Sequence, residues 1–137
     1  MKIQAGIMTM VHSSGVTRKF SIFTIIIACV HFVLENLHTY LFGQPFVGLL
    51  PDYIAVALML GGGFMVLKDP RARGILCGAW GFAVCLHYRS WAWRFEAVLD
   101  GTATSVNETT MYVLALTMPI SIICFTLSLL LCVPKKT

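Results

Sequence analysis

Three residues whose side chains could bind a metal ion or transfer a proton lie at helical spacing near position 35. His31, Glu35 and His38 stand at i, i+4 and i+7, and an α-helix places all three within about 60° of one another on one stripe. Imidazole and carboxylate groups can ligate a metal ion or haem, or move a proton. Glu35-x-x-His38 is also one copy of the step that di-iron helix bundles use twice. The stripe is therefore a candidate binding or catalytic surface.

A second group of polar and aromatic residues follows near position 90. Helical phase puts His87, Trp91 and Arg94 on one face and Arg89 on another, because His87 and Arg89 lie about 200° apart around a helix. We expect a ligand-binding or buried polar cluster, without assigned catalytic residues or metal ligands, formed by His31, Glu35, His38, His87, Arg89 and Trp91.

Four apolar stretches must position these residues. The chain has 137 residues, of which 58% are hydrophobic and only 12% charged, whereas a soluble domain has about 25% charged residues. About 20 apolar residues in a helix satisfy every backbone polar group inside hydrocarbon. The sequence predicts transmembrane helices at about 20–42, 47–67, 74–94 and 109–133. We expect one all-α domain over 1–137, an integral membrane four-helix up-down bundle, with no room for a Rossmann unit or a P-loop.

The basic residues predict how the bundle is oriented, because Lys and Arg are retained on the cytoplasmic side of short loops. With both termini cytoplasmic, that side holds eight of the ten basic residues, and the other side holds only Arg89 and Arg94. The eight are Lys2, Arg18, Lys19, Lys68, Arg71, Arg73, Lys135 and Lys136. The net charge of +4 is therefore an orientation signal, and we expect no nucleic-acid partner.

The rise along each helix predicts which charges meet. At 1.5 Å per residue, Glu35 and Arg89 both lie about 22 Å above the inner boundary, and Asp52 lies about 24 Å above it. Because a charge in hydrocarbon costs about 2.5–3.5 kcal/mol on insertion scales, we expect Glu35 and Arg89 to form an ion pair. Asp52 follows Pro51, and we interpret it as a first-turn acid favoured by the helix dipole.

Small residues predict where helix backbones approach closely. The motifs Ala57-x-x-x-Gly61 and Gly74-x-x-x-Gly78 are of the kind found at helix–helix contacts in membranes, and the glycine run at 61–63 favours close packing over a flexing point. All five cysteines lie within the predicted helices and none forms a C-x-x-C motif. We interpret them as small apolar fillers, which argues against a membrane thiol oxidoreductase.

Two interpretations of function remain open. The first is a non-catalytic binding or accessory subunit of a membrane assembly, in contact with the lipid bilayer and with a protein partner or a second copy of the chain. The alternative is a membrane enzyme, or a redox, metal or haem protein, in which His31 and Glu35, with His87, act on a lipid-like molecule such as a quinone or sterol. His31, Glu35 and His87 would then ligate a single metal ion, or His31 and His87 a haem.

A limited resemblance adds to the second interpretation. The chain has the pattern His31-x-x-x-Glu35 in its first predicted helix. In its number of helices and in having an acidic residue within the membrane, it is similar to the four-helix emopamil-binding family. The resemblance covers these two residues. It implies a pocket in which His31 or Glu35 bonds the polar head of a lipid-like molecule and aromatic residues hold its apolar body.

Overall fold

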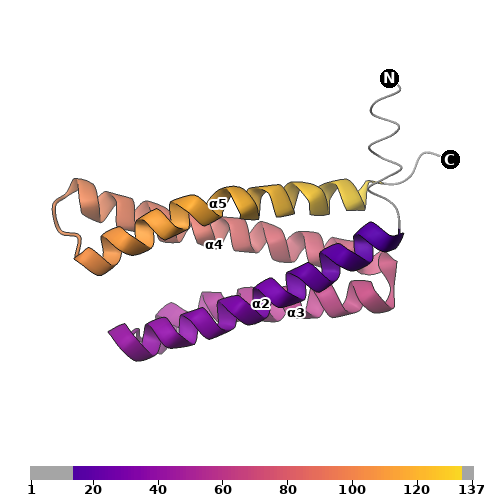
Figure 1. Cartoon of the computed structure of the whole chain (residues 1–137), viewed down its shortest axis with the longest axis horizontal. Coiled ribbons are helices and arrows are strands. Elements are labelled where there is room, and N and C mark those ends of the chain that lie inside the picture. Colours follow the sequence, from indigo (N-terminus) through magenta and orange to yellow (C-terminus); the bar gives the residue numbers. More distant parts are fainter. Residues whose placement is uncertain (1–13, 134–137) are drawn as a thin grey trace, which may run out of the picture.

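The computed structural model describes residues 14–133. Lys2, Lys135 and Lys136, three of the basic residues used to predict the orientation, lie outside the described residues. The described chain forms the helices α2 (Ser14–Phe42), α3 (Phe46–Lys68), α4 (Arg73–Leu99) and α5 (Ser105–Cys132), with a 3-10 turn η1 (Pro70–Ala72) between α3 and α4. The helices run alternately up and down (Figure 1), which confirms the predicted all-α four-helix up-down arrangement.

Three of these helices are long and apolar enough to cross a membrane, namely Gly15–Phe42 within α2, α3, and α5. Large apolar side chains cover their outer faces, and Val33 and Leu116 expose 61% and 76% of their surface. Hydrocarbon is the solvent in which such faces are stable, because each helix satisfies its own backbone polar groups. The chain is an integral, multi-pass membrane protein.

Helix α4 is as long as the other helices but is not one of these three. Its second half carries Arg89, Arg94 and Glu96, and it continues to Leu99, past the end of the span expected at 74–94. Beyond Leu99, Gly101 adopts a positive φ of 66° and Thr102 N donates to Ala97 O at 2.9 Å, which is how helices commonly end at glycine. The connection to α5 is therefore only residues 100–104.

The helices form two hairpins, α2 with α3 and α4 with α5, which are joined where α3 packs against α4. Glycines allow the close contacts between α3 and its neighbours. A Cβ on Gly62 would lie 3.1 Å from Leu76 Cα, and one on Gly63 would lie 2.6 Å from Ile25 Cγ1. The close packing predicted for the glycine run is confirmed at these two positions.

The other glycines of the predicted packing motifs are different. Around Gly61, Gly74 and Gly78, a Cβ would meet nothing within 4 Å in the described structure. The prediction that these motif positions pack against another helix is wrong within this chain. The sequence spacing is present, but the backbones that come close are those beside Gly62 and Gly63.

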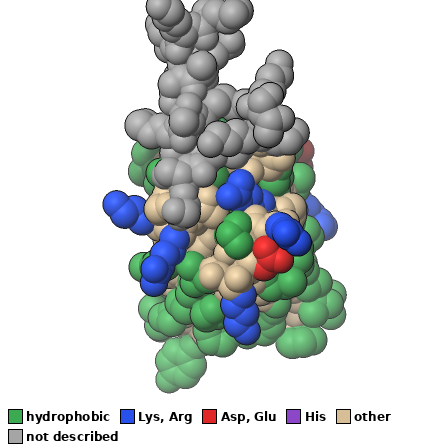
Figure 2. Space-filling model, turned by 90° about the vertical axis from the view of Figure 1, so that its right-hand side faces the viewer, with side chains coloured by type: hydrophobic (Ala, Val, Ile, Leu, Met, Phe, Trp, Pro, Cys, Tyr) green, Lys and Arg blue, Asp and Glu red, His purple; other side chains and the backbone are tan. Residues whose placement is uncertain are grey.

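Lys and Arg side chains gather at one end of the bundle (Figure 2). This end holds the start of α2 and the α3–α4 connection, with Arg18, Lys19, Lys68, Arg71 and Arg73. Arg73 Nη1 donates to Leu131 O at 3.2 Å, and so binds a carbonyl in the last turn of α5. We call it the basic end; that it faces the cytoplasm stays a prediction.

Candidate functional site: a cavity between the two hairpins

A cavity of about 520 Å³ lies between the hairpins and is lined by all four helices. Along α2 its lining extends from Ile27 to Phe42, a length of about 22 Å at 1.5 Å per residue. A smaller hollow of about 250 Å³ adjoins it and is lined by Phe42 together with Ser105, Val106, Thr109 and Thr110. The cavity therefore extends to the end of the bundle opposite the basic end, where α2 ends and α5 begins.

The way the hairpins are joined explains why a cavity forms there. Near the basic end, Trp80 of α4 is only 2% exposed and stacks on Phe20 of α2 at 6.1 Å. Away from that end α2 and α5 diverge (Figure 1), and among the described helices they are not a closely packed pair. Toward the basic end the lining stops at Trp80 and Met59, and at the other end the cavity adjoins the smaller hollow beside Phe42.

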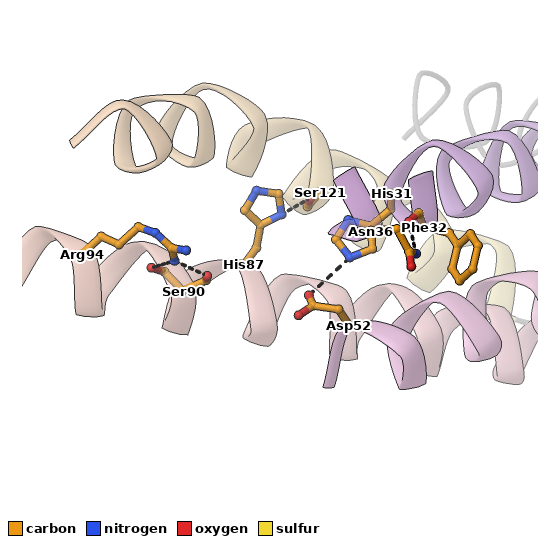
Figure 3. Close-up of polar contacts among 8 residues, drawn as sticks. All are labelled: His31, Phe32, Asn36, Asp52, His87, Ser90, Arg94 and Ser121. Carbon is orange, nitrogen blue, oxygen red and sulfur yellow. Dashed lines mark hydrogen bonds and ion pairs between the residues drawn. The ribbon is translucent and has the colours of Figure 1, made fainter. Parts of the chain in front are cut away.

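An imidazole and two carboxylates meet on one wall of the cavity. His31 of α2 faces Asp52 of α3, with His31 Nε2 3.4 Å from Asp52 Oδ1 (Figure 3). Glu35 lies beside them: His31, Glu35 and Asp52 each offer one ligand atom, and all three atoms lie within 4.8 Å of one another. The two helices of the first hairpin thus bring together three groups that can bind a cation.

The interpretation of Asp52 as a first-turn acid is wrong. Helix α3 begins at Phe46, so Pro51 lies inside it and Asp52 belongs to the second turn. Because Pro51 has no N–H, the carbonyl of Val47 loses its usual helical donor. Asp52 instead faces the cavity and pairs with His31.

His87 of α4 is held by two hydroxyl groups of α5. Its Nε2 lies 2.7 Å from Thr117 Oγ1. Its Nδ1 lies 3.1 Å from Ser121 Oγ, and Figure 3 shows this second contact. When Thr117 Oγ1 donates its proton to Val113 O, at 2.9 Å, it accepts from a protonated Nε2, and Nδ1 accepts the Ser121 hydroxyl proton. When Thr117 donates to Nε2 instead, Nδ1 is protonated and donates to Ser121 Oγ. Both ring nitrogens of a neutral His87 are satisfied, and this histidine ties α4 to α5.

The predicted ion pair between Glu35 and Arg89 is wrong. Arg89 is exposed and does not line the cavity, and within residues 14–133 it forms no ion pair with Glu35. The arginine that lines the cavity is Arg94, whose charge acts on both Glu35 and Asp52. Arg94 Nη1 donates to Ser90 O at 2.9 Å and to Ser90 Oγ at 2.7 Å.

The six residues expected to form the polar cluster are divided by the structure. His31, Glu35, His38 and His87 all line the cavity. His38 lies toward the wide end, with its ring 5.0 Å from that of Phe42. Trp91 is not part of the lining; it stacks on Phe95 at 5.0 Å. Arg89 and Trp91 therefore lie outside the cavity that holds the other four.

The sequence analysis missed the contribution of α5 to the site. Thr110, Thr117 and Ser121 all line the cavity, and their spacing of i, i+7 and i+11 places them on one face of a helix. A row of hydroxyl groups on one face of an otherwise apolar span could have indicated from the sequence that this face of α5 lines the site. Thr117 and Ser121 occupy both nitrogens of His87. In the alternative interpretation, a metal site of His31, Glu35 and His87, or a haem between His31 and His87, would therefore have to break these bonds.

The chemistry available is therefore uneven along the cavity. On the α2–α3 side, His31, Glu35 and Asp52 offer ligand atoms within 4.8 Å of one another, which could hold a cation. On the α4–α5 side the polar groups bond one another, and the rest of the lining is mainly apolar. No protein-family model, curated protein or solved structure matches the chain.

Proposed function

We propose that the protein is a non-catalytic binding protein that holds one small lipid-like molecule in the cavity. The cavity volume of about 520 Å³ is the observation that carries the proposal, because sites for small organic molecules occupy about 300–1,000 Å³ and combine apolar walls with a few convergent polar groups.

The distribution of side chains supports an amphiphilic occupant. The polar head would lie against His31, Glu35 and Asp52, and the apolar body would follow the aliphatic wall, which includes Leu34 and Val113. Quinones and sterols are the chemical classes with this combination of a small polar group and a larger apolar body. The divergence of α2 and α5 (Figure 1) supports a route by which such a molecule reaches the site from the lipid.

Purification of the full chain in a mild detergent, followed by native mass spectrometry and analysis of the extracted small molecules, tests the proposal. We expect one lipid-like molecule for each chain. A protein that co-purifies at fixed stoichiometry, without such a molecule, would support the accessory-subunit role instead. Turnover of the bound molecule would support the enzyme interpretation.

Two alanine variants make the test specific to the cavity. Ala83→Phe adds a ring to the lining of α4, so we expect the bound molecule to be lost. Ala115→Phe adds the same ring on the exposed face of α5, away from the lining, so we expect the molecule to be retained. Equal retention in both folded variants would contradict a cavity-bound ligand.

A further inference from the structure

We propose that His31, Glu35 and Asp52 together bind one divalent transition-metal ion on the α2–α3 wall of the cavity. This inference goes beyond the proposed function and does not depend on it, because the apolar part of the cavity can hold a molecule with or without a metal. It also differs from the metal set of the alternative interpretation, since Asp52 takes the place of His87.

The distance between the two closest ligand atoms fits a shared ion. Zn–N and Zn–O bonds are about 2.0–2.2 Å long, so two ligands of a tetrahedral ion lie about 3.4 Å apart. His31 Nε2 and Asp52 Oδ1 are 3.4 Å apart. The Glu35 oxygen lies within 4.8 Å of both, and rotation about its flexible side-chain bonds brings it within ligand distance.

His31 Nε2 also lacks a satisfactory partner in the described structure. The atom is buried and makes no hydrogen bond, because its contact with Asp52 has the length of an ion pair without hydrogen-bond geometry. Within residues 14–133 the Glu35 carboxylate receives no side-chain hydrogen bond either. One cation at this position would satisfy all three side chains.

Charge and donor type favour a divalent first-row metal. Two carboxylates neutralise a +2 ion, and a neutral imidazole adds no charge, so the loaded site would carry no net charge inside the low-dielectric bundle. A nitrogen donor with two oxygen donors suits Zn²⁺, Fe²⁺ or Mn²⁺. Three protein ligands also leave a coordination position open toward the cavity.

The competing arrangement balances the same charges without a metal. A protonated His31, together with Arg94, would offset the charges of Glu35 and Asp52, because the charge of Arg94 acts on both carboxylates. The two arrangements differ in one measurable property: only the first retains a stoichiometric ion at these three residues.

The experiment uses the full chain, purified without a polyhistidine tag, treated with a chelator and then titrated with Zn²⁺ or Co²⁺. We expect one ion for each chain by elemental analysis, and visible Co²⁺ absorption bands. Asp52→Asn and His31→Gln should each weaken binding at least about 10-fold. His87→Gln and His38→Gln are matched controls on the same cavity, and we expect both to retain the ion.

Absence of a stoichiometric ion in the folded wild-type chain would overturn the proposal, as would retention in both ligand variants or loss in His87→Gln. If Asp52→Asn does not fold, X-ray absorption of the Zn²⁺-loaded wild type gives the ligand set directly, and more than one histidine nitrogen would contradict it. Retention of the lipid-like molecule, measured in the same preparations, separates failure of the metal site from failure of the proposed function.

Discussion

Trp80 Nε1 donates a 3.0 Å hydrogen bond to Thr24 Oγ1, and this bond joins the two hairpins at the end of the cavity nearest the basic end. Thr24 Oγ1 gives its own proton to Phe20 O at 2.9 Å, so the two bonds use the hydroxyl once as acceptor and once as donor. Thr24 is fully buried and Trp80 is 2% exposed. The pair fixes the distance between α2 and α4 at the level from which the hairpins diverge.

Thr24→Val tests this connection. The substitution preserves the shape of the side chain but leaves the buried indole N–H without an acceptor, so we expect a loss of about 0.5–2 kcal/mol of stability. Thermal unfolding in detergent, followed by gel filtration, measures it. Thr126→Val is the control, because Thr126 is exposed and its hydroxyl bonds only Ile122 O of its own helix. Equal losses in both variants would show that the bond to Trp80 contributes nothing.

The arginines of α4 should differ in their effect on the fold. Arg94 lines the cavity and acts on Glu35, whereas Arg89 is exposed. We expect Arg94→Gln to lower the yield of folded protein and Arg89→Gln to stay within about 0.5 kcal/mol of wild type. Adding Glu35→Gln should restore part of the yield that Arg94→Gln loses, and it should have no such effect on Arg89→Gln. Restoration with Arg89→Gln instead would reinstate the pair that we expected from the sequence.

Much of the fold could be predicted from the sequence because hydropathy and helix length constrain a membrane protein strongly. Three of the four expected spans are apolar enough to cross the membrane, and the short connections led directly to antiparallel neighbours. Helical phase also placed His87, Trp91 and Arg94 on one face, and His87 and Arg94 line the cavity, whereas Trp91 does not. These predictions use only the geometry within one helix.

The predictions that were wrong depended on which side chains of neighbouring helices face one another. Height alone suggested Arg89 as the partner of Glu35, but height does not fix the direction in which a side chain points. Asp52 was misjudged because Pro51 was taken to mark a first turn, although the span itself was expected from residue 47 and α3 begins at Phe46. The hydroxyls that bond His87 come from α5, and a single-helix pattern cannot show which helix lies opposite.

The orientation of the bundle is tested by single cysteines at its two ends. Gly15→Cys lies at the basic end, where a Cβ meets nothing within 4 Å, and Ser105→Cys lies at the opposite end. With the native cysteines replaced, we expect an impermeant thiol reagent to label Ser105→Cys on intact cells, and Gly15→Cys only after permeabilisation. Labelling of Gly15→Cys from outside would reverse the predicted cytoplasmic location of the basic end.

The last prediction concerns the protonation and role of His87. Thr117 Oγ1 has Val113 O as an acceptor for its own proton, whereas the Ser121 hydroxyl has its contact with His87 Nδ1, so we expect a neutral ring with its proton on Nε2. The ¹⁵N chemical shifts of the imidazole measure this directly. Ser121→Ala removes the Nδ1 contact and should shift mainly that nitrogen.

Stability measurements distinguish this structural role from a ligand role. In a double-mutant cycle, His87→Phe and Ser121→Ala should be coupled by about 0.5–1.5 kcal/mol, because each single change removes the same interhelical bond. Ser128→Ala is the control, since the hydroxyl of Ser128 bonds only Phe125 O within α5. A haem or metal ligand at His87 would instead give a visible absorption spectrum or a retained ion that His87→Gln abolishes. Such a signal, with no coupling to Ser121, would show that the two hydroxyls do not determine the state of His87.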